Sequence, residues 1–106
     1  MNKYRNIKTV VDNITFDSKK EAARYSDLKL LETAHHIMHL ETQPRFPLMI
    51  NCKRVATYIG DFKYWSPSEN ERIIEDVKSE ATKTPLYRLK KKILEAQEPP
   101  VIITEI

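Results

Sequence analysis

The chain has 106 residues, 41% of them apolar, enough for one domain with a modest core spanning 1–106. Its apolar runs are too short to cross a membrane and none follows Met1 as a secretory signal would, so we expect a cytoplasmic protein without membrane contact. A net charge of +3 is compatible with nucleic-acid binding. The single cysteine, Cys52, excludes an internal disulfide and is expected to be an inert, buried or half-buried thiol.

The first 17 residues predict a basic N-terminal β-hairpin ahead of a core at 18–106. Short strand-like segments at 9–11 and 14–16 flank Asp12 and Asn13, which tolerate the positive φ of a type I′ turn. Lys3, Arg5 and Lys8 make this end basic. A hairpin this small needs support, either from the following helix or from a partner subunit.

A helix is predicted from Ser18 to about Ala34. Ser18 and Glu21 have the spacing of a capping box, and good helix formers follow them. At 100° per residue, Glu21 falls on one stripe with Tyr25 and Leu28, at the N-terminal end of the inward face.

Three strands are predicted next. The segment 36–50 is strand-like but interrupted by Pro44 and Pro47, which favours an edge or bent strand. The segment 54–65 alternates as one strand, with Gly60 as a bulge or a point of close backbone approach. Turn residues 66–70 lead into a strand at 72–78.

A second helix is predicted to begin at Thr84 and Pro85 and to end before Pro99. A last strand follows at 101–106, so the order after the hairpin is helix, three strands, helix, strand. This order predicts an α/β fold with a mixed sheet flanked by helices. The buried stripe of the second helix is expected to consist of Leu86, Leu89, Ile93 and Ala96.

The strands at 54–65 and 72–78 carry a pair of carboxylates. If their turn is centred between residues 68 and 69, Asp61 lies directly opposite Asp76, where like charges repel. A divalent cation reverses that repulsion, and two carboxylates with waters are how Mg²⁺ is usually held. Such a site suits phosphodiester hydrolysis.

Two further residues fit this chemistry. Strand alternation sends Lys78 to the side of Asp76 and Glu75 to the other. An ammonium group there is placed to orient an attacking water or to neutralise phosphate charge. Glu21, on the inward helix face, is placed to complete the shell of the cation or to position water.

These residues resemble the PD-(D/E)XK nuclease signature, with Gly60 where many members have proline. The longer motifs are similar to a family of small phage-encoded nuclease-like proteins, at residues 14–22, 43–46, 61–62, 75–78 and 87–92. The resemblance implies a restriction-endonuclease-like core, and Mg²⁺ bound by Asp61, Asp76 and the carbonyl of Val77 with support from Glu21. It also implies Lys78 as the catalytic lysine, and many small members of the superfamily are dimers.

The basic segment near the second helix is a candidate DNA contact, and its expected members are Lys83, Tyr87, Arg88, Lys90 and Lys91.

Each functional assignment has a structural alternative. A charge run is often only a solvated helix face, Glu21 has a full explanation as the partner of Ser18, and the residues at 61, 76 and 78 fit an exposed polar strand face. The histidines are expected to be surface residues, with zinc as the less favoured reading: His35, His36 and His39.

The combined prediction is a phage-type DNA endonuclease that uses Mg²⁺, with Mn²⁺ as a substitute, and no small-molecule cofactor. It is expected to act in the bacterial host cytoplasm, with selectivity for branched DNA such as a Holliday junction or a flap. A homodimer is expected because one site cuts one strand. The alternatives are a catalytically inactive nuclease-fold protein that binds DNA as an accessory or inhibitor, and a structural adaptor of a phage replication or packaging complex.

Overall fold

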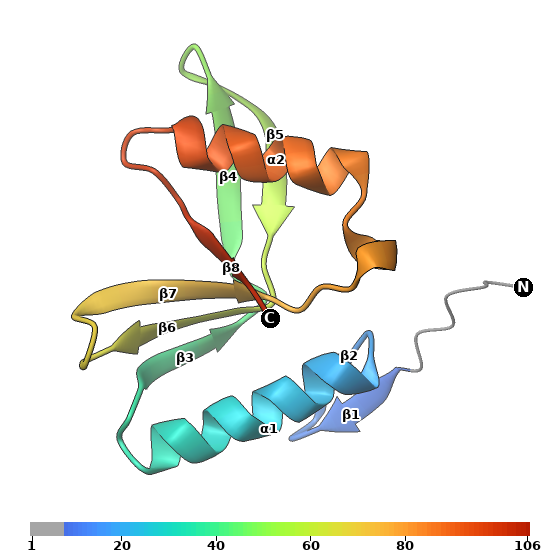
Figure 1. Cartoon of the computed structure of the whole chain (residues 1–106), viewed down its shortest axis with the longest axis vertical. Helices are drawn as coiled ribbons and strands as arrows, with labels where there is room; N and C mark the ends of the chain where they lie inside the picture. The colour runs from blue at the N-terminus through green and yellow to red at the C-terminus, as the bar shows by residue number, and fades with distance from the viewer. Residues whose placement is uncertain (1–7) are drawn as a thin grey trace, which may run out of the picture.

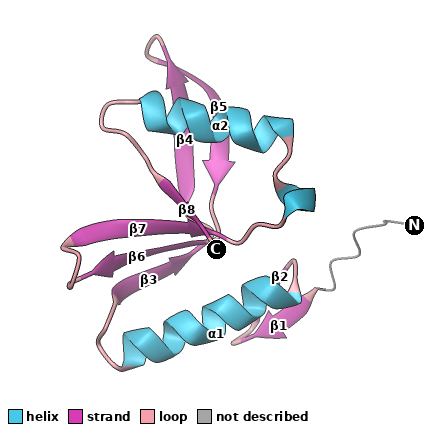
Figure 2. Cartoon of the chain, viewed as in Figure 1, coloured by secondary structure: helices cyan, strands magenta, loops and turns pink. Residues whose placement is uncertain are grey.

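The computed structural model describes residues 8–106, with Glu80 described by its backbone alone. It is an α/β fold with a mixed sheet and two main helices (Figures 1 and 2). No helix within 8–106 is long and apolar enough to cross a membrane. Lys3 and Arg5 of the predicted basic end lie outside the described residues. The elements are β1 (Thr9–Val11), β2 (Ile14–Phe16), α1 (Lys19–Thr33), β3 (Met38–Thr42), β4 (Arg45–Ile50), β5 (Lys53–Ile59), β6 (Phe62–Ser66), β7 (Glu71–Asp76), a 3-10 turn (Glu80–Thr82), α2 (Pro85–Ala96) and β8 (Ile103–Glu105).

The main sheet has the strand order β3-β6-β7-β8. Its first three strands are antiparallel, and β8 runs parallel to β7, which makes the sheet mixed. β1 pairs with β2 and β4 pairs with β5 in separate antiparallel hairpins. In Figure 1, α1 and the β1-β2 hairpin lie on one side of the main sheet, and α2 and the β4-β5 hairpin lie on the other.

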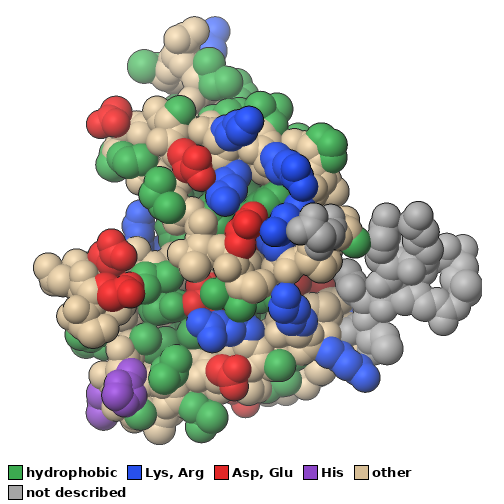
Figure 3. All heavy atoms as spheres, in the orientation of Figure 1, with side chains coloured by type: hydrophobic (Ala, Val, Ile, Leu, Met, Phe, Trp, Pro, Cys, Tyr) green, Lys and Arg blue, Asp and Glu red, His purple; other side chains and the backbone are tan. Residues whose placement is uncertain are grey.

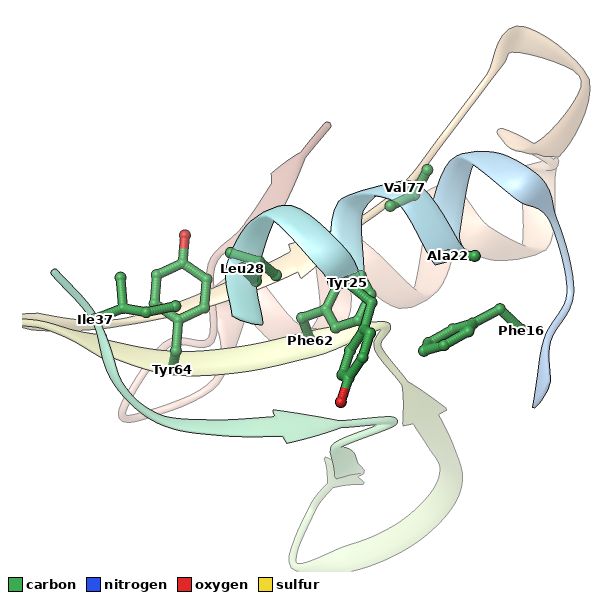
Figure 4. Packing of buried hydrophobic residues seen from close by; sticks show 8 residues of the cluster. All are labelled: Phe16, Ala22, Tyr25, Leu28, Ile37, Phe62, Tyr64 and Val77. Carbon is green, nitrogen blue, oxygen red and sulfur yellow. The ribbon is translucent and has the colours of Figure 1, made fainter. Parts of the chain in front are cut away.

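The core between α1 and the main sheet is rich in aromatic rings (Figure 4). The Phe16 and Tyr25 rings lie 5.1 Å apart by centroid, a normal distance for an aromatic pair. Tyr25 also donates a hydrogen bond to Asp12 Oδ2 at 2.9 Å, so the helix supports the hairpin. The buried residues of this core are Phe16, Ala22, Tyr25, Leu28, Ile37, Phe62, Tyr64 and Val77.

The hairpin turn has the predicted backbone. Asp12 and Asn13 both have positive φ, at 53° and 62°, as the two central residues of a type I′ turn require. The register pairs Thr9 with Phe16 across the hairpin and brings the Phe16 ring into the core.

A second core lies between α2, the β4-β5 hairpin and the other face of the sheet. Its buried residues are Phe46, Leu48, Tyr58, Ile74, Tyr87, Leu94 and Ile103. Ile74 and Ile103 come from the neighbouring strands β7 and β8, so both faces of the main sheet are covered near these residues.

The start of α1 depends on Ser18, whose Oγ accepts a hydrogen bond from the Glu21 amide at 3.1 Å. We expect Ser18→Ala to lower the free energy of unfolding by about 1 kcal/mol, because it leaves one amide of the first turn without its acceptor. Urea unfolding followed by circular dichroism measures this loss. Ser26→Ala is the control, because the Ser26 hydroxyl bonds only the carbonyl of Ala22 within the helix and its removal should be near neutral.

Two of the predicted strands are wrong in extent, because each is two strands in different sheets. The segment 36–50 divides into β3 and β4, and 54–65 divides into β5 and β6, so five strands separate the helices instead of three. The chain changes sheets at Gly60, whose amide donates to the Pro44 carbonyl at 2.9 Å. A Cβ on Gly60 would lie 3.4 Å from the Pro44 ring, which is ordinary van der Waals contact, so lack of space does not require glycine here.

The predicted buried stripe of α2 is wrong for three of its four residues. Leu86 and Leu89 are 61% and 55% exposed, and Ala96 is exposed as well. Tyr87 and Leu94 are the buried residues of α2, with Ile93 partly buried. Cys52 is exposed at the tip of the β4-β5 hairpin, contrary to the expected burial.

Candidate functional site

The predicted register of the central hairpin is confirmed. Phe62 pairs with Glu75 and Ser66 pairs with Glu71, as a turn centred between residues 68 and 69 requires. Asp61 comes directly before β6, and its amide donates to the Glu75 carbonyl at 3.1 Å. This bond brings Asp61 beside the end of β7, but the paired register ends at Phe62 and Glu75, so the structure does not pair Asp61 directly with Asp76 as predicted.

The Asp61 carboxylate is fixed by the backbone that follows β7. Its Oδ2 accepts a hydrogen bond from the Val77 amide at 2.7 Å. This hydrogen bond joins Asp61, which follows the change of sheet at Gly60, to Val77, which lies between Asp76 and Lys78.

Asp76 is 2% exposed, and its Oδ2 has no hydrogen-bond partner among the described residues. Lys78 Nζ lies 3.8 Å from this oxygen, close enough for an ion pair but beyond a hydrogen bond. A buried carboxylate oxygen without a partner is costly, and a proton or a cation relieves the cost.

Glu75 faces the other side of the sheet, as the alternation predicted. It is 1% exposed and forms a two-point ion pair with Arg24, at 2.8 Å to Nε and 2.6 Å to Nη2. Tyr64 donates to the same carboxylate. The buried charge of Glu75 is therefore paired with Arg24 and takes no part in the Asp61 and Asp76 cluster.

Glu21, in the first turn of α1, lies near enough to Asp61 and Asp76 for their charges to act on it. Burial, with the nearby charges of Asp61, Asp17 and Asp76, raises the pKa of Glu21 to about 7, while a hydrogen bond from the Asp17 backbone acts the other way. The Ser18 hydroxyl accepts a hydrogen bond from the Glu21 amide, so Ser18 makes its half of the expected capping box. The Glu21 carboxyl nevertheless lies within electrostatic reach of both aspartates.

Burial also raises the pKa of Asp76, to about 6, with Lys78 opposing the shift and Glu105 adding to it. The pKa of Asp61 is raised for the same first reason, while the Val77 amide and Lys78 lower it. The folded chain thus holds protons at these carboxyl groups more tightly than free carboxyl groups do, and bringing the charges together costs stability.

This electrostatic arrangement predicts a pH-dependent difference between the wild type and Asp76→Asn. A group whose pKa is raised on folding stabilises the protein below its unfolded pKa, and the contribution is lost as the pH rises through about 6. We therefore expect Asp76→Asn to gain stability relative to the wild type between about pH 4 and pH 7. Urea unfolding of both proteins in chelator, at several pH values, measures the difference in their free energies of unfolding. A difference that stays constant with pH contradicts the raised pKa of Asp76.

The donor set can be compared with the needs of a metal ion. No group of three or more His, Cys, Asp and Glu side chains within the described part of the chain is arranged to hold a metal. Mg²⁺ needs fewer protein side chains than such a group contains, because it keeps several of its waters. Asp61 and Asp76, with a backbone carbonyl and waters, are oxygen ligands of the kind that Mg²⁺ accepts. The unpartnered Oδ2 of Asp76 fits such a cation.

Lys78 is held by its surroundings. Its Nζ lies 4.2 Å from the centroid of the Tyr87 ring, a cation–π distance. Its carbonyl accepts a hydrogen bond from Lys20 at 3.0 Å, which ties the end of β7 to the first turn of α1. Lys20 was not singled out by the sequence, because the contact joins residues 58 positions apart.

Glu105 on β8 is a second residue that the sequence analysis missed. It receives a hydrogen bond from the Tyr87 hydroxyl at 2.7 Å and pairs with Lys83 and Lys91 at 3.5 and 3.6 Å. Since β8 is parallel to β7 with Glu105 in register with Asp76, the carboxylate lies beside the site. Only the strand pairing reveals this position, because residues 104–105 carry no motif.

The predicted DNA-contact residues line two neighbouring clefts. Lys83, Tyr87, Arg88 and Lys91 line a cleft of about 440 Å³ along α2. Lys90 lies in a second cleft together with Lys78. Figure 3 shows Lys and Arg side chains over α2 and over α1 on the same face, with acidic side chains between them.

The histidines stay apart from this site. His35, His36 and His39 are exposed at the turn after α1 and on β3, as expected for surface residues. None of them belongs to a potential metal-binding group within 8–106.

Comparisons with known proteins give a family without an assigned activity. No curated protein and no solved structure matches the chain. One family model matches over residues 1–106, which is the whole chain. The chain therefore belongs to the family described as "Protein of unknown function (DUF1064)".

Proposed function

We propose that this protein is a Mg²⁺-dependent DNA endonuclease with a restriction-endonuclease-like core. One observation carries the proposal: Asp61 is hydrogen-bonded to the Val77 amide, between Asp76, whose Oδ2 has no hydrogen-bond partner among the described residues, and Lys78, whose Nζ lies 3.8 Å from that oxygen. Glu21 on α1 is within electrostatic reach of both aspartates. The ordered resemblance to small phage-encoded nuclease-like proteins, which places these same residues in the motif, supports it.

The proposed roles follow from the contacts. Asp61, Asp76 and the Val77 carbonyl would hold the cation, and the hydrogen bond from the Val77 amide to Asp61 Oδ2 at 2.7 Å keeps Val77 beside that carboxylate. When bound, Mg²⁺ supplies Lewis-acid activation of the phosphodiester. Glu21, whose carboxyl lies within electrostatic reach of both aspartates, is suited to position an attacking water or to accept its proton.

Lys78 supplies positive charge where the transition state gains negative charge. The Tyr87 ring at 4.2 Å and the Asp76 carboxylate at 3.8 Å restrain the ammonium group before substrate arrives. Preorganised charge of this kind needs no rearrangement during the reaction.

The basic clefts on α2 would take the DNA backbone. Lys83 and Lys91 both lie within ion-pair distance of Glu105, at 3.5 and 3.6 Å, so these ammonium groups are held beside the site. Arg88, exposed on the rim of the larger cleft, adds a further cation. Contacts of this kind position a backbone without reading its sequence.

The test is incubation of the purified protein with end-labelled linear, flapped and four-way-junction DNA, in Mg²⁺ and in chelator. We expect cleavage of at least one DNA in Mg²⁺ and none in chelator. Absence of cleavage in all of them, with DNA binding retained at low salt, favours instead an inactive nuclease-fold protein that binds DNA.

The same proposal predicts a charge effect on DNA affinity. Arg88→Gln is expected to weaken binding to every DNA and to reduce the slope of log affinity against log salt by about one, because one phosphate contact is lost. Fluorescence anisotropy over a salt series measures the slope. Arg54→Gln, at an exposed position near the tip of the β4-β5 hairpin, is the control and should leave it unchanged; equal slopes for all three proteins contradict the assigned DNA surface.

A further inference from the structure

A groove of about 320 Å³ opens beside Lys78, between β5 and the beginning of α2. Its volume lies at the lower end of the roughly 300–1,000 Å³ of small-molecule pockets. One wall carries Lys78 and Lys90, and Lys90 Nζ is anchored 3.4 Å from the Thr57 carbonyl. The groove therefore presents two ammonium groups next to the site.

The remaining walls combine three threonines, Thr57, Thr82 and Thr84, with two exposed apolar side chains. Ile59 on β5 and Leu86 on α2 line the groove and are 48% and 61% exposed. A phosphate group alone has no use for these side chains, since lysines suffice to bind it. A ligand that contacts the lysines and the apolar side chains at once needs a negative charge and a flat or apolar part, as in a nucleotide.

Tyr58 supports the groove from the core side. It is 4% exposed, and its ring packs against that of Tyr87 with centroids 6.2 Å apart. Its hydroxyl is buried without a hydrogen-bond partner among the described residues, so it is not a contact for a ligand in the groove.

We propose that this groove receives one unpaired nucleotide next to the phosphate that is cut, so that the substrate is DNA with unpaired nucleotides, such as a flap or a bulge. The inference rests on the proposed nuclease function and narrows its substrate class. In a paired duplex the base faces are covered by stacking and the base edges by pairing, which leaves Ile59 and Leu86 without a counterpart. Extruding an unpaired base costs little free energy, and the extruded base exposes both its faces and its edges.

The test uses duplex DNA with a single unpaired 2-aminopurine and the matching fully paired duplex. Binding is measured in chelator, which prevents cleavage, by anisotropy and by 2-aminopurine emission. The wild type is expected to bind the bulged DNA about tenfold more tightly than the paired DNA, with a change in emission. Leu86→Glu is expected to lose both the preference and the emission change.

Leu89→Glu is the matched control, because Leu89 is 55% exposed on the same helix and does not line the groove. It carries the same charge change and should keep the preference for bulged DNA. Equal binding of the two DNAs by the wild type, or an unchanged preference in Leu86→Glu, overturns the inference and leaves the nuclease proposal intact. No binding of either DNA at low salt overturns both.

Discussion

Asp76→Asn is expected to abolish Mg²⁺-dependent cleavage, with a loss of roughly 10³-fold, while the protein still folds and binds DNA. A loss of this size is typical when charge stabilisation at a reacting centre is removed. Asparagine has nearly the same shape as aspartate but lacks the charge that would hold a cation beside Lys78. DNA affinity should be equal or higher, because one negative charge is removed from the DNA-facing site. Cleavage rates and anisotropy on the same DNA measure the two effects.

Asp27→Asn is the matched control for this change. Asp27 lies on the exposed side of α1, so its variant removes one carboxylate without touching the site. It should cut DNA at the wild-type rate. If Asp76→Asn cuts as fast as Asp27→Asn, Asp76 has no part in catalysis and the assigned site is wrong.

Arg24→Met is expected to destabilise the fold by about 3–5 kcal/mol, the usual cost of leaving one member of a buried ion pair without its partner. The Glu75 carboxylate is 1% exposed and would keep only the Tyr64 hydroxyl. Urea unfolding at pH 7 measures the loss.

Lys63→Met is the comparison for this variant. Lys63 pairs with Glu41 at 3.1 Å, but the Glu41 side chain is 57% exposed, so this change should cost at most about 1 kcal/mol. Similar small losses for both variants would mean that water reaches Glu75 and that the Arg24 pair is not essential to the core.

Local sequence signals predicted the parts of the fold that depend on local physics. Asp12 and Asn13 accept positive φ, Ser18 accepts the amide of the first helical turn, and the turn at 66–70 sets the β6-β7 register. Because register and alternation together fix which side chains share a face, the pairing of Asp76 with Lys78 and the separation of Glu75 were also predictable.

The change of sheet at Gly60 was not predictable from alternation. Residues before and after it alternate with the same period, and only Gly60 and Asp61 separate two strands that pair with different partners. The choice of partners depends on how the β4-β5 hairpin packs against α2, which is tertiary information. The same packing explains why Tyr87 and Leu94 are buried in place of Leu86 and Leu89.

The surroundings of the site were predictable only in part. Lys78 and Tyr87 were each singled out, but their 4.2 Å contact depends on how α2 returns to the sheet. Glu105 reaches the site through parallel pairing of β8 with β7, and Lys20 through a contact between the first turn of α1 and the end of β7. No local pattern encodes either contact.

The most direct measurement of the central claim is Mn²⁺ binding to the metal-free protein, followed by electron paramagnetic resonance, with Mg²⁺ as competitor. We expect one Mn²⁺ per chain for the wild type and for Asp27→Asn, displaced by Mg²⁺, and no binding by Asp76→Asn. Equal binding by all three proteins, or none by the wild type at millimolar metal, would contradict a metal-dependent site at Asp61 and Asp76.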